Sequence, residues 1–358
     1  MYGDAMVEIL SSLSVKNLLR FKCVCKSWYS LIENPSFISK HLKNVSTRLI
    51  VVYMDEDDGT DEYYHPTDLS CMFPDETLAD LSVQDLDHQQ PATGVLGGPY
   101  DGIYCIFGLR DRITLWNVAT RDSRTLPNYG PTCPRNTKVY KTSVGFGLDP
   151  NRNDYKLIMI YTFWDERTTE LHEFSLCTIY NLRTNSWRDL VCFKTIHYCI
   201  PHSHGCTYLD GLCHWLWELE DSKHKIIISF DMANEVFQEV QCPDIASSAY
   251  METLDLYHDS LSLLFLNTTN NHYEIWVLKE RIWSKHLSVT LIGVEEPLGV
   301  WKNGGFFVQS DSRPRRLLLY DPNTQEMRDL GLRSFWFSVY NFKESLIPVK
   351  GVDSFSDI

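Results

Sequence analysis

The residues of this sequence that could bind a metal are gathered in one short stretch. It contains two cysteines and two histidines, followed by a Cys-His pair: Cys199, His202, His204, Cys206, Cys213 and His214. Thiolates and imidazoles at such short spacings are typical ligands of structural zinc sites. The stretch from Cys206 to Trp217, however, alternates as a β-hairpin does, and alternation places neighbouring side chains on opposite faces of a strand. We therefore expect no metal site and no cofactor here.

A second concentration of ionisable groups is acidic. Six carboxylates fall within the eight positions that start at residue 55: Asp55, Glu56, Asp57, Asp58, Asp61 and Glu62. Their spacing is not that of an EF-hand calcium loop. A charge run of this kind indicates either a solvated loop or one side of a binding face for a basic partner. We take these six residues as the candidate substrate-binding group.

Motifs for catalysis are missing from the sequence. It has no Gly-x-Ser-x-Gly elbow, no phosphate-binding Gly-Lys-Ser/Thr loop and no His-Glu-x-x-His. Gly145-Phe-Gly147 lacks the third glycine and the helix that a dinucleotide fold needs. We expect a protein that is not an enzyme; a glycosidase with paired carboxylates is the one enzymatic alternative left open.

Charge and hydropathy limit the partners. The net charge is −14, and because residues 1–44 carry a net +3, the rest carries −17. Such a surface excludes nucleic acid, which needs a basic footprint, and favours a basic protein. No apolar stretch is long enough to span a membrane, and Asp4 and Glu8 interrupt any signal peptide. The sequence therefore indicates a cytoplasmic protein whose 11 cysteines are reduced.

The elements that position these groups fall into two regions. Residues 1–44 have helical periodicity and predict three short helices: Ala5–Ser11, a segment from Ser14 to the Asn34-Pro35 stop, and Ser36–Leu42. About 40 residues is near the lower limit for an independent core, so this region needs another surface to complete it. Its apolar residues are the candidate partner-binding group: Ile9, Leu10, Leu13, Leu18, Leu19, Val24 and Trp28.

Residues 45–358 have the period of two that is typical of strands. Five copies of one unit occur, each an apolar strand, a turn and a returning strand that starts with a large apolar residue. The equivalent turn positions are residues 117, 181, 231, 277 and 321, and Val277 departs from the Asn or Asp found at the other four. Spacings near 45–50 residues are typical of propeller blades. The length predicts an all-β, kelch-like propeller of about six blades, with five or seven as alternatives.

Several motifs resemble known families. Val7-Glu-Ile-Leu, Val15-Lys-Asn-Leu-Leu-Arg-Phe-Lys-Cys-Val-Cys-Lys-Ser-Trp and Pro35-Ser-Phe-Ile-Ser-Lys-His resemble plant F-boxes. The motifs after residue 100 resemble the F-box-associated domain: Gly102-Ile-Tyr-Cys, Trp116-Asn-Val-Ala-Thr-Arg, Gly145-Phe-Gly-Leu-Asp-Pro with Asp154-Tyr-Lys, and Pro297-Leu-Gly-Val-Trp-Lys. The whole is most similar to the S-locus F-box proteins of pollen, and the ending Ser345-Leu-Ile-Pro-Val-Lys also fits them.

This resemblance implies a role. An F-box binds a Skp-type adaptor, which is joined to a cullin and a RING subunit, and the following domain recognises the substrate for ubiquitination. In the S-locus proteins the substrates are non-self S-ribonucleases, which are generally basic, and the site of action is the pollen tube cytosol. The resemblance thus implies a substrate receptor of an SCF-type ubiquitin ligase in self-incompatibility.

Two alternatives remain. The first keeps the ligase role and changes the substrate. The second arises because F-boxes of this kind usually begin Leu-Pro before an acidic pair, whereas Met1-Tyr2-Gly3 precede Asp4 here. With its first adaptor-contacting residues replaced or missing, the chain would be an interaction protein outside the ligase.

Overall fold

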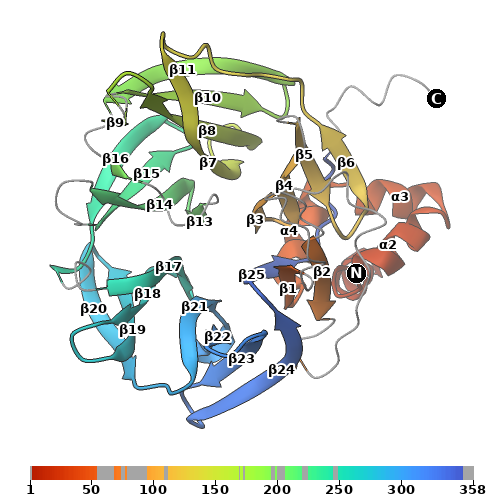
Figure 1. The fold of residues 1–358 in the computed structure, drawn as a ribbon. Coiled ribbons are helices and arrows are strands. Elements are labelled where there is room, and N and C mark those ends of the chain that lie inside the picture. The colour runs from red at the N-terminus through yellow and green to blue at the C-terminus, as the bar shows by residue number, and fades with distance from the viewer. Residues whose placement is uncertain are drawn as a thin grey trace. The chain divides into compact units, whose positions relative to one another are not determined.

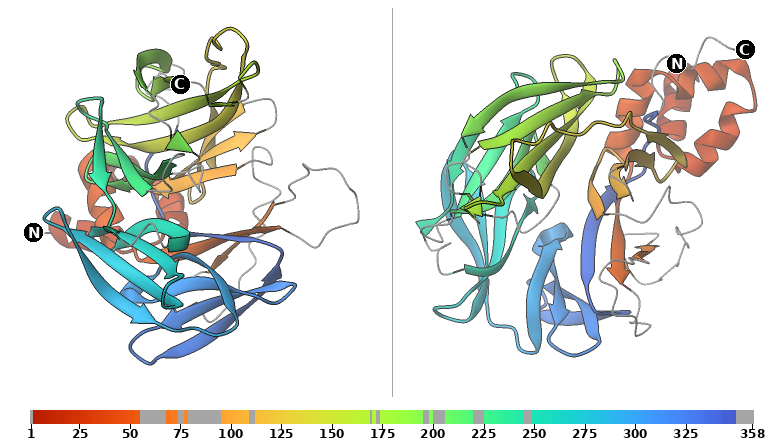
Figure 2. Two further views of the ribbon diagram at one scale, coloured as in Figure 1. Left: turned by 60° about the vertical axis from the view of Figure 1, so that its left-hand side comes forward. Right: turned by 45° about the horizontal axis from the view of Figure 1, so that its top comes forward.

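The helical region contains four helices where the sequence predicted three. The structure is a computed structural model, and it describes residues 2–54, 68–73, 77–78, 95–108, 112–168, 170–171, 174–194, 198–199, 206–219, 225–244 and 249–349. The helices are α1 (Tyr2–Ser11), α2 (Val15–Lys22), α3 (Lys26–Ile32) and α4 (Pro35–Asn44), of which Figure 1 labels α2, α3 and α4. They lie together as one group, which Figure 2 shows from two further directions.

The predicted middle helix is interrupted at Cys23-Val24-Cys25, so the prediction of three helices was wrong. Cys23 is the C-cap of α2 and Cys25, in an extended conformation, is the N-cap of α3. Cysteine and β-branched valine form helices poorly, so little local energy opposes the break. The turn is stabilised by an aromatic contact between the two helices: the Phe21 and Trp28 rings meet edge to face, with their centroids 5.1 Å apart. The link Cys23–Cys25 is called the α2–α3 link below.

The last helix begins at Pro35, one residue before the predicted start at Ser36, and ends at Asn44, two residues after the predicted end at Leu42. Asn34 is its N-cap, with Oδ1 accepting from the Ser36 N–H at 2.9 Å, and Pro35 occupies the first turn. Proline suits this position because its missing N–H would have no partner there. Farther along α4, His41 is fully buried and its Nε2 lies 2.8 Å from the carbonyl of Leu13. This contact ties α4 to the segment between α1 and α2.

The chain forms two units, and each is described by itself. Unit 1 is Met1–Asp55, Gly59–Leu126 and Val339–Ile358, and unit 2 is Glu56–Asp58 and Pro127–Ser338. Besides the helices, unit 1 has an antiparallel sheet that we call blade 1: β3 (Val95–Tyr100), β4 (Ile103–Gly108), β5 (Arg112–Asn117) and β6 (Asp122–Thr125). A three-stranded sheet has the order β2-β1-β25, from β2 (Asp68–Phe73), β1 (Thr47–Met54) and β25 (Phe337–Lys343).

Unit 2 consists of four antiparallel sheets in sequence order. Blade 2 has β7 (Thr137–Asp149), β8 (Asp154–Asp165), β9 (Glu170–Leu171), β10 (Phe174–Asn181) and β11 (Ser186–Lys194). Blade 3 has β12 (Tyr198–Cys199), β13 (Thr207–Leu209), β14 (Leu212–Leu219), β15 (Lys225–Asp231) and β16 (Val236–Gln241). Blade 4 has β17 (Ala249–Tyr257), β18 (Ser260–Asn267), β19 (His272–Lys279) and β20 (Ile282–Val289). Blade 5 has β21 (Val294–Val300), β22 (Phe306–Ser310), β23 (Arg315–Asp321) and β24 (Glu326–Ser334), with a 3-10 turn η3 (Lys302–Gly304) after β21.

Each of the five sequence copies is the hairpin between the last two strands of one blade. At four of them an Asn or Asp opens the turn, as at Asp231, whose Oδ1 accepts from the N–H groups of Ala233 and Asn234 at 2.8 and 2.9 Å. The copy in blade 4 differs, because position 277 lies within β19 and the turn is made by Glu280 and Arg281, both with positive φ. That two-residue turn needs no side-chain acceptor, which explains why the pattern lacks Asn or Asp there.

The described residues give five blades, and the prediction of about six was too high. The predicted number came from dividing the length of the chain by the repeat period. That division counted as a sixth blade the residues before β3, some of which belong to the three-stranded sheet. Counting the copies would have given the right number. The kelch-like character remains a prediction. Among the described residues, no helix is long and apolar enough to cross a bilayer.

Candidate functional site

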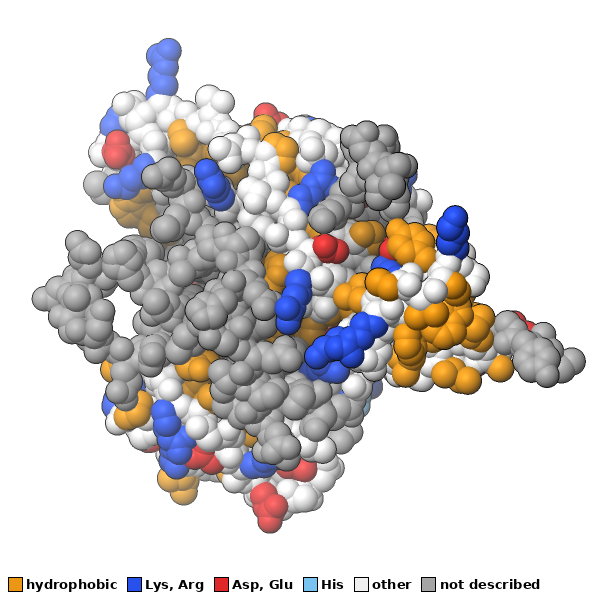
Figure 3. All heavy atoms as spheres, turned by 90° about the vertical axis from the view of Figure 1, so that its right-hand side faces the viewer, with side chains coloured by type: hydrophobic (Ala, Val, Ile, Leu, Met, Phe, Trp, Pro, Cys, Tyr) orange, Lys and Arg blue, Asp and Glu red, His pale blue; other side chains and the backbone are white. Residues whose placement is uncertain are grey.

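Apolar side chains of the helical region are exposed beside basic ones. Ile9 at the end of α1 is 64% exposed and Val24 in the α2–α3 link is 62% exposed, and Tyr29 of α3 is also exposed. Figure 3 shows the face on which apolar side chains of the helical region gather, with Lys and Arg side chains nearby. A branched aliphatic side chain that stays in water gains stabilisation when a partner covers it. We call Ile9, Val24 and Tyr29 the exposed apolar group.

The structure separates the seven predicted partner-binding residues into three classes. Leu10 and Leu18, at 3% and 0% exposure, lie in the core among the helices, with Val15, Ile32 and Phe37. They support the helices and are not open to a partner in the free chain. Leu13, Leu19 and Trp28 are half-buried, and Leu13 and Leu19 pack against this core. Ile9 and Val24 are open, and adaptor contact by these two stays a prediction.

Two residues of the α2–α3 link, Cys23 and Cys25, were not predicted from the sequence as part of the site. Cys23 and Cys25 are exposed, and together with Lys22, Lys26, Tyr29 and Ser30 they line a shallow depression. Their position could not be read from helical spacing, because the link is not helical. The usable signal was chemical: a Cys-Val-Cys run between two basic residues has low helix propensity.

The pKa of Cys25 lies below the ordinary thiol value. The hydrogen bond with Ser27, whose Oγ lies 3.1 Å from the thiol, is the main cause, and the Trp28 N–H adds to it. Since this thiol is exposed, the lowered pKa makes it a good reporter of whether something covers the α2–α3 link.

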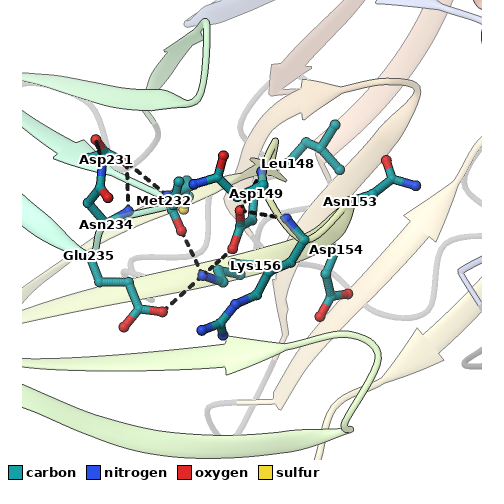
Figure 4. Close-up of polar contacts among 12 residues, drawn as sticks. Leu148, Asp149, Asn153, Asp154, Lys156, Asp231, Met232, Asn234 and Glu235 are labelled. Carbon is teal, nitrogen blue, oxygen red and sulfur yellow. Dashed lines mark hydrogen bonds and ion pairs between the residues drawn. The ribbon is translucent and has the colours of Figure 1, made fainter.

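The motif Gly145-Phe-Gly-Leu-Asp-Pro with Asp154-Tyr-Lys forms a buried ionic cluster between blades 2 and 3. Lys156 on β8 is fully buried, and its Nζ lies 2.6 Å from Asp149 Oδ2 and 2.9 Å from Glu235 Oε1. It also donates to the carbonyl of Met232 at 2.6 Å. Figure 4 shows the ammonium between these three acceptors. Arg188 pairs with the other oxygen of Glu235.

The electrostatics of this cluster favour the charged forms. Burial acts to raise the pKa of Asp149, but hydrogen bonds from Lys156 and from the N–H groups of Arg152 and Asn151 outweigh it, so this pKa is lowered. Glu235 follows the same pattern: burial acts to raise its pKa, and Arg188 and Lys156 lower it by more. Satisfied buried charges of this kind hold structure together and are not poised for proton transfer. We assign the motif to joining two blades.

The motif that starts at Pro297 has a similar position between blades 4 and 5. The carbonyl of Pro297 accepts from Thr253 Oγ1 at 3.0 Å, and the N–H of Val300 donates to Asp255 Oδ2 at 2.7 Å. Burial raises the pKa of Asp255 to about 6, against the effect of the two N–H groups that it accepts. Both contacts run from β17 to β21 and fix the spacing of the two sheets.

Within the described residues, the histidine and cysteine cluster brings together the thiols of Cys206 and Cys213, which share a hydrogen bond, and no group of three ligands forms. Cys213 and His214 are neighbours on β14; His214 Nδ1 lies 2.7 Å from Ser229 Oγ on β15, and Cys213 belongs to the core with Trp215. Burial lowers the pKa of His214 to about 4, so it is neutral at physiological pH. His202 and His204 lie outside the described residues, as do all six carboxylates of the acidic run, Asp55 to Glu62. No group of metal ligands occurs in the part of the chain that is described.

Comparisons with known proteins assign both regions. Residues 4–48 match the F-box domain family, and residues 78–346 match the F-box associated beta propeller domain. A putative F-box protein of Arabidopsis thaliana is 26% identical across 67% of this chain and 60% of its own length. An F-box/kelch-repeat protein of the same plant is 28% identical across 87% of this chain and 85% of its own.

A further F-box protein of Arabidopsis thaliana is 24% identical over 92% of this chain and 85% of its own length. The second family match covers most of the sequence and includes blade 1, the described parts of blades 2 to 5 and the Asp149–Lys156 motif. The chain belongs to the plant F-box proteins that carry an F-box-associated β-propeller domain.

Proposed function

We propose that this chain is the substrate receptor of an SCF-type cullin–RING ubiquitin ligase. Its helices bind a Skp-type adaptor, the adaptor connects to the cullin and RING subunits, and the blades bind the substrate. The observation that carries the proposal is the exposure of Ile9 and Val24 on the helices that match the F-box family. Lys16, Arg20 and Lys26 are exposed near them, so an adaptor with an acidic groove would fit.

The receptor contributes proximity and no bond chemistry. Holding a substrate lysine beside the ubiquitin-loaded conjugating enzyme turns a bimolecular encounter into a local one, which accelerates transfer strongly. Within unit 1, Glu344 contacts the start of α2, and the neighbouring Ser345 contacts Asn117 of blade 1, so the adaptor-binding helices are connected to that blade. This role requires no catalytic side chain in the receptor.

The adaptor half is tested with point variants of the full chain. Val24→Asp and Ile9→Asp each place a charge where an apolar contact is proposed, and each should weaken adaptor binding by at least about tenfold, since burial of one such side chain is worth about 1.5–3 kcal/mol. Ile292→Asp is the matched control, because Ile292 is 94% exposed and lies in unit 2. Equal binding of all three variants, measured by calorimetry, would refute the proposal.

For the substrate, we propose non-self S-ribonucleases in pollen. Two observations support this: the residues after position 44 carry a net −17, and the motifs of the chain resemble the S-locus F-box proteins. The acidic run from Asp55 to Glu62 is the candidate contact for a basic ribonuclease.

Binding of style ribonucleases at low and high ionic strength tests this half. Tight binding should weaken as salt rises, because exposed charges are screened. Replacement of the six carboxylates by amides should remove most of the salt dependence, with an acidic ribonuclease as the negative control. Salt-independent binding, or binding of both ribonucleases alike, would exclude the acidic face. Another substrate for the same ligase would then be the better interpretation.

A further inference from the structure

We propose that the segment Glu344–Val349, at the other end of the chain, is a structural part of the F-box. The adaptor-binding helices reach their competent form only after this C-terminal segment has docked on them. This proposal rests on the proposed function, since it concerns control of adaptor binding. It makes the ability to join a ligase depend on a chain that has been synthesised and folded at least as far as Val349.

The first observation is the cap of α2. Ser14 stands at the N-cap position, but its side chain makes no capping hydrogen bond. The N–H of Val15 instead donates to Glu344 Oε2 at 3.1 Å, across 329 residues of sequence. A carboxylate is the favoured partner at this place, because the N-terminus of a helix carries partial positive charge. The side chain that caps the start of α2 therefore belongs to the C-terminal segment.

The second observation is that Glu344 is fixed from two sides. Its other oxygen, Oε1, accepts from Arg48 Nη1 at 2.7 Å, and the side chain is only 12% exposed. Arg48 lies on β1, directly after the helical region. Glu344 thus connects the start of α2 with the strand that leads away from α4, and its charge is compensated where it is buried.

The third observation is the core of the helices. Leu346, 4% exposed, is a member of the same cluster as Leu10, Val15, Leu18 and Phe37. The sequence indicated that a region of about 40 residues must complete its core against another surface. Within unit 1, part of that surface is the chain's own C-terminal segment.

The fourth observation is that the segment cannot easily shift. On the side of blade 1, Asn117 Nδ2 donates to the carbonyls of Ser345 and Ile347, both at 3.0 Å. Gly102 approaches so closely that a Cβ at its position would lie 2.6 Å from the carbonyl oxygen of Lys343. Ala119, in the turn after β5, also packs against the helical core. The segment therefore lies between the helices and blade 1, in contact with both.

The order in which the two segments are synthesised determines when the helices can bind the adaptor. The helices emerge from the ribosome before Leu346, which follows them by more than 300 residues, and domains fold as their sequences become available. A nascent or shortened receptor would have an uncapped α2 and an open core next to the exposed apolar group. Such a chain would not occupy adaptor molecules in an unproductive complex.

The test uses full-length variants. Leu346→Ala opens the core and Glu344→Ala removes the cap, whereas Pro348→Ala is the matched control because Pro348 is exposed in the same segment. Glu344→Gln keeps an acceptor for the Val15 N–H and should fall between Glu344→Ala and the parent chain. We expect at least tenfold weaker adaptor binding for Leu346→Ala and Glu344→Ala, and parental affinity for Pro348→Ala.

Hydrogen exchange of the same samples separates a local effect from general unfolding. The amides of α1 and α2 should lose protection by at least tenfold in the two damaging variants, while those of β22 and β23 keep theirs. Parental protection and parental affinity in both variants would overturn the inference. If the parent chain itself fails to bind the adaptor, the proposed function fails, and the exchange of α2 still decides whether the segment completes the F-box.

Discussion

Replacement of Lys156 by methionine should destabilise unit 2 more than any surface change of the same kind. The side chain of Lys156 is fully buried, and its ammonium is the only cation that the described structure places on Asp149. Methionine has a similar length, so the packing of the aliphatic part is kept while the charge is removed. The substitution leaves a fully buried carboxylate with two N–H donors and no counter-charge.

The expected cost is about 3–5 kcal/mol, the range found when one partner of a buried ion pair is removed. Most of this cost comes from Asp149, because Glu235 retains Arg188 and is partly exposed. The variant Lys138→Met is the matched control. Lys138 lies on β7 of the same blade, is 65% exposed and is 3.9 Å from Glu166, so its loss should cost under about 0.5 kcal/mol.

Urea unfolding followed by tryptophan fluorescence measures both variants, since Trp215 and Trp217 lie in the adjoining core. The pH dependence adds a second criterion. The pKa values of Asp149 and Glu235 are lowered in the folded chain, so their contribution is complete above the ordinary carboxyl pKa of about 4 and is lost as pH falls through the folded values. Lys156→Met should flatten this acid limb. A cost below about 1 kcal/mol, or an unchanged acid limb, would refute the reasoning.

Three further changes have defined outcomes. Gly102→Ala should lower the stability of unit 1 by about 2–4 kcal/mol in thermal unfolding, because φ is +78° and the new Cβ would meet a backbone oxygen. An unchanged melting temperature would contradict this. His214 is buried with a pKa of about 4, so it should contribute stability that is complete above pH 6.5 and lost, by about 3 kcal/mol, as pH falls towards 4; His214→Gln should remove that slope from the unfolding midpoints. A saturating Skp-type adaptor should protect the thiols of the α2–α3 link from alkylation but not exposed Cys133, as peptide mass spectrometry can show; equal labelling of all three would argue against docking at the link.

Local pattern was a good guide where a feature depends on neighbours in sequence. The boundary at Asn34-Pro35, predicted as a helix stop, and the four turns that Asn or Asp opens follow from caps and turn chemistry that act over three or four residues. The five copies correspond to the five blades, including the blade 4 copy without Asn or Asp. The error in blade number arose from dividing length by period, which treats the ends of the chain as a blade.

The candidate site could be predicted only in part, because it depends on contacts between residues that are far apart in the sequence. A helical stripe shows which residues are apolar, but not which of them the chain's own core uses, so Leu10 and Leu18 could not be told from Ile9 and Val24. That distinction depends on how the helices pack against one another and on Leu346, more than 300 residues away in the sequence. The turn at the α2–α3 link was not predicted either: the Cys-Val-Cys run permits a break in the helix, but the packing of Phe21 on Trp28 selects it.

Composition and local pattern were enough to recognise the class of the protein: a helical F-box that cannot complete its own core, followed by repeated β-hairpins with an acidic net charge. These features are sums over local composition and short periods, which tertiary contacts cannot change. The roles of the individual motifs could be assigned only from contacts between distant parts of the chain. Lys156 meets Asp149 and Glu235 between two blades, and Glu344 caps α2 from the far end of the chain. Such pairings are long-range and electrostatic. The sequence does not show which distant residue will compensate the free-energy cost of burying a charged side chain.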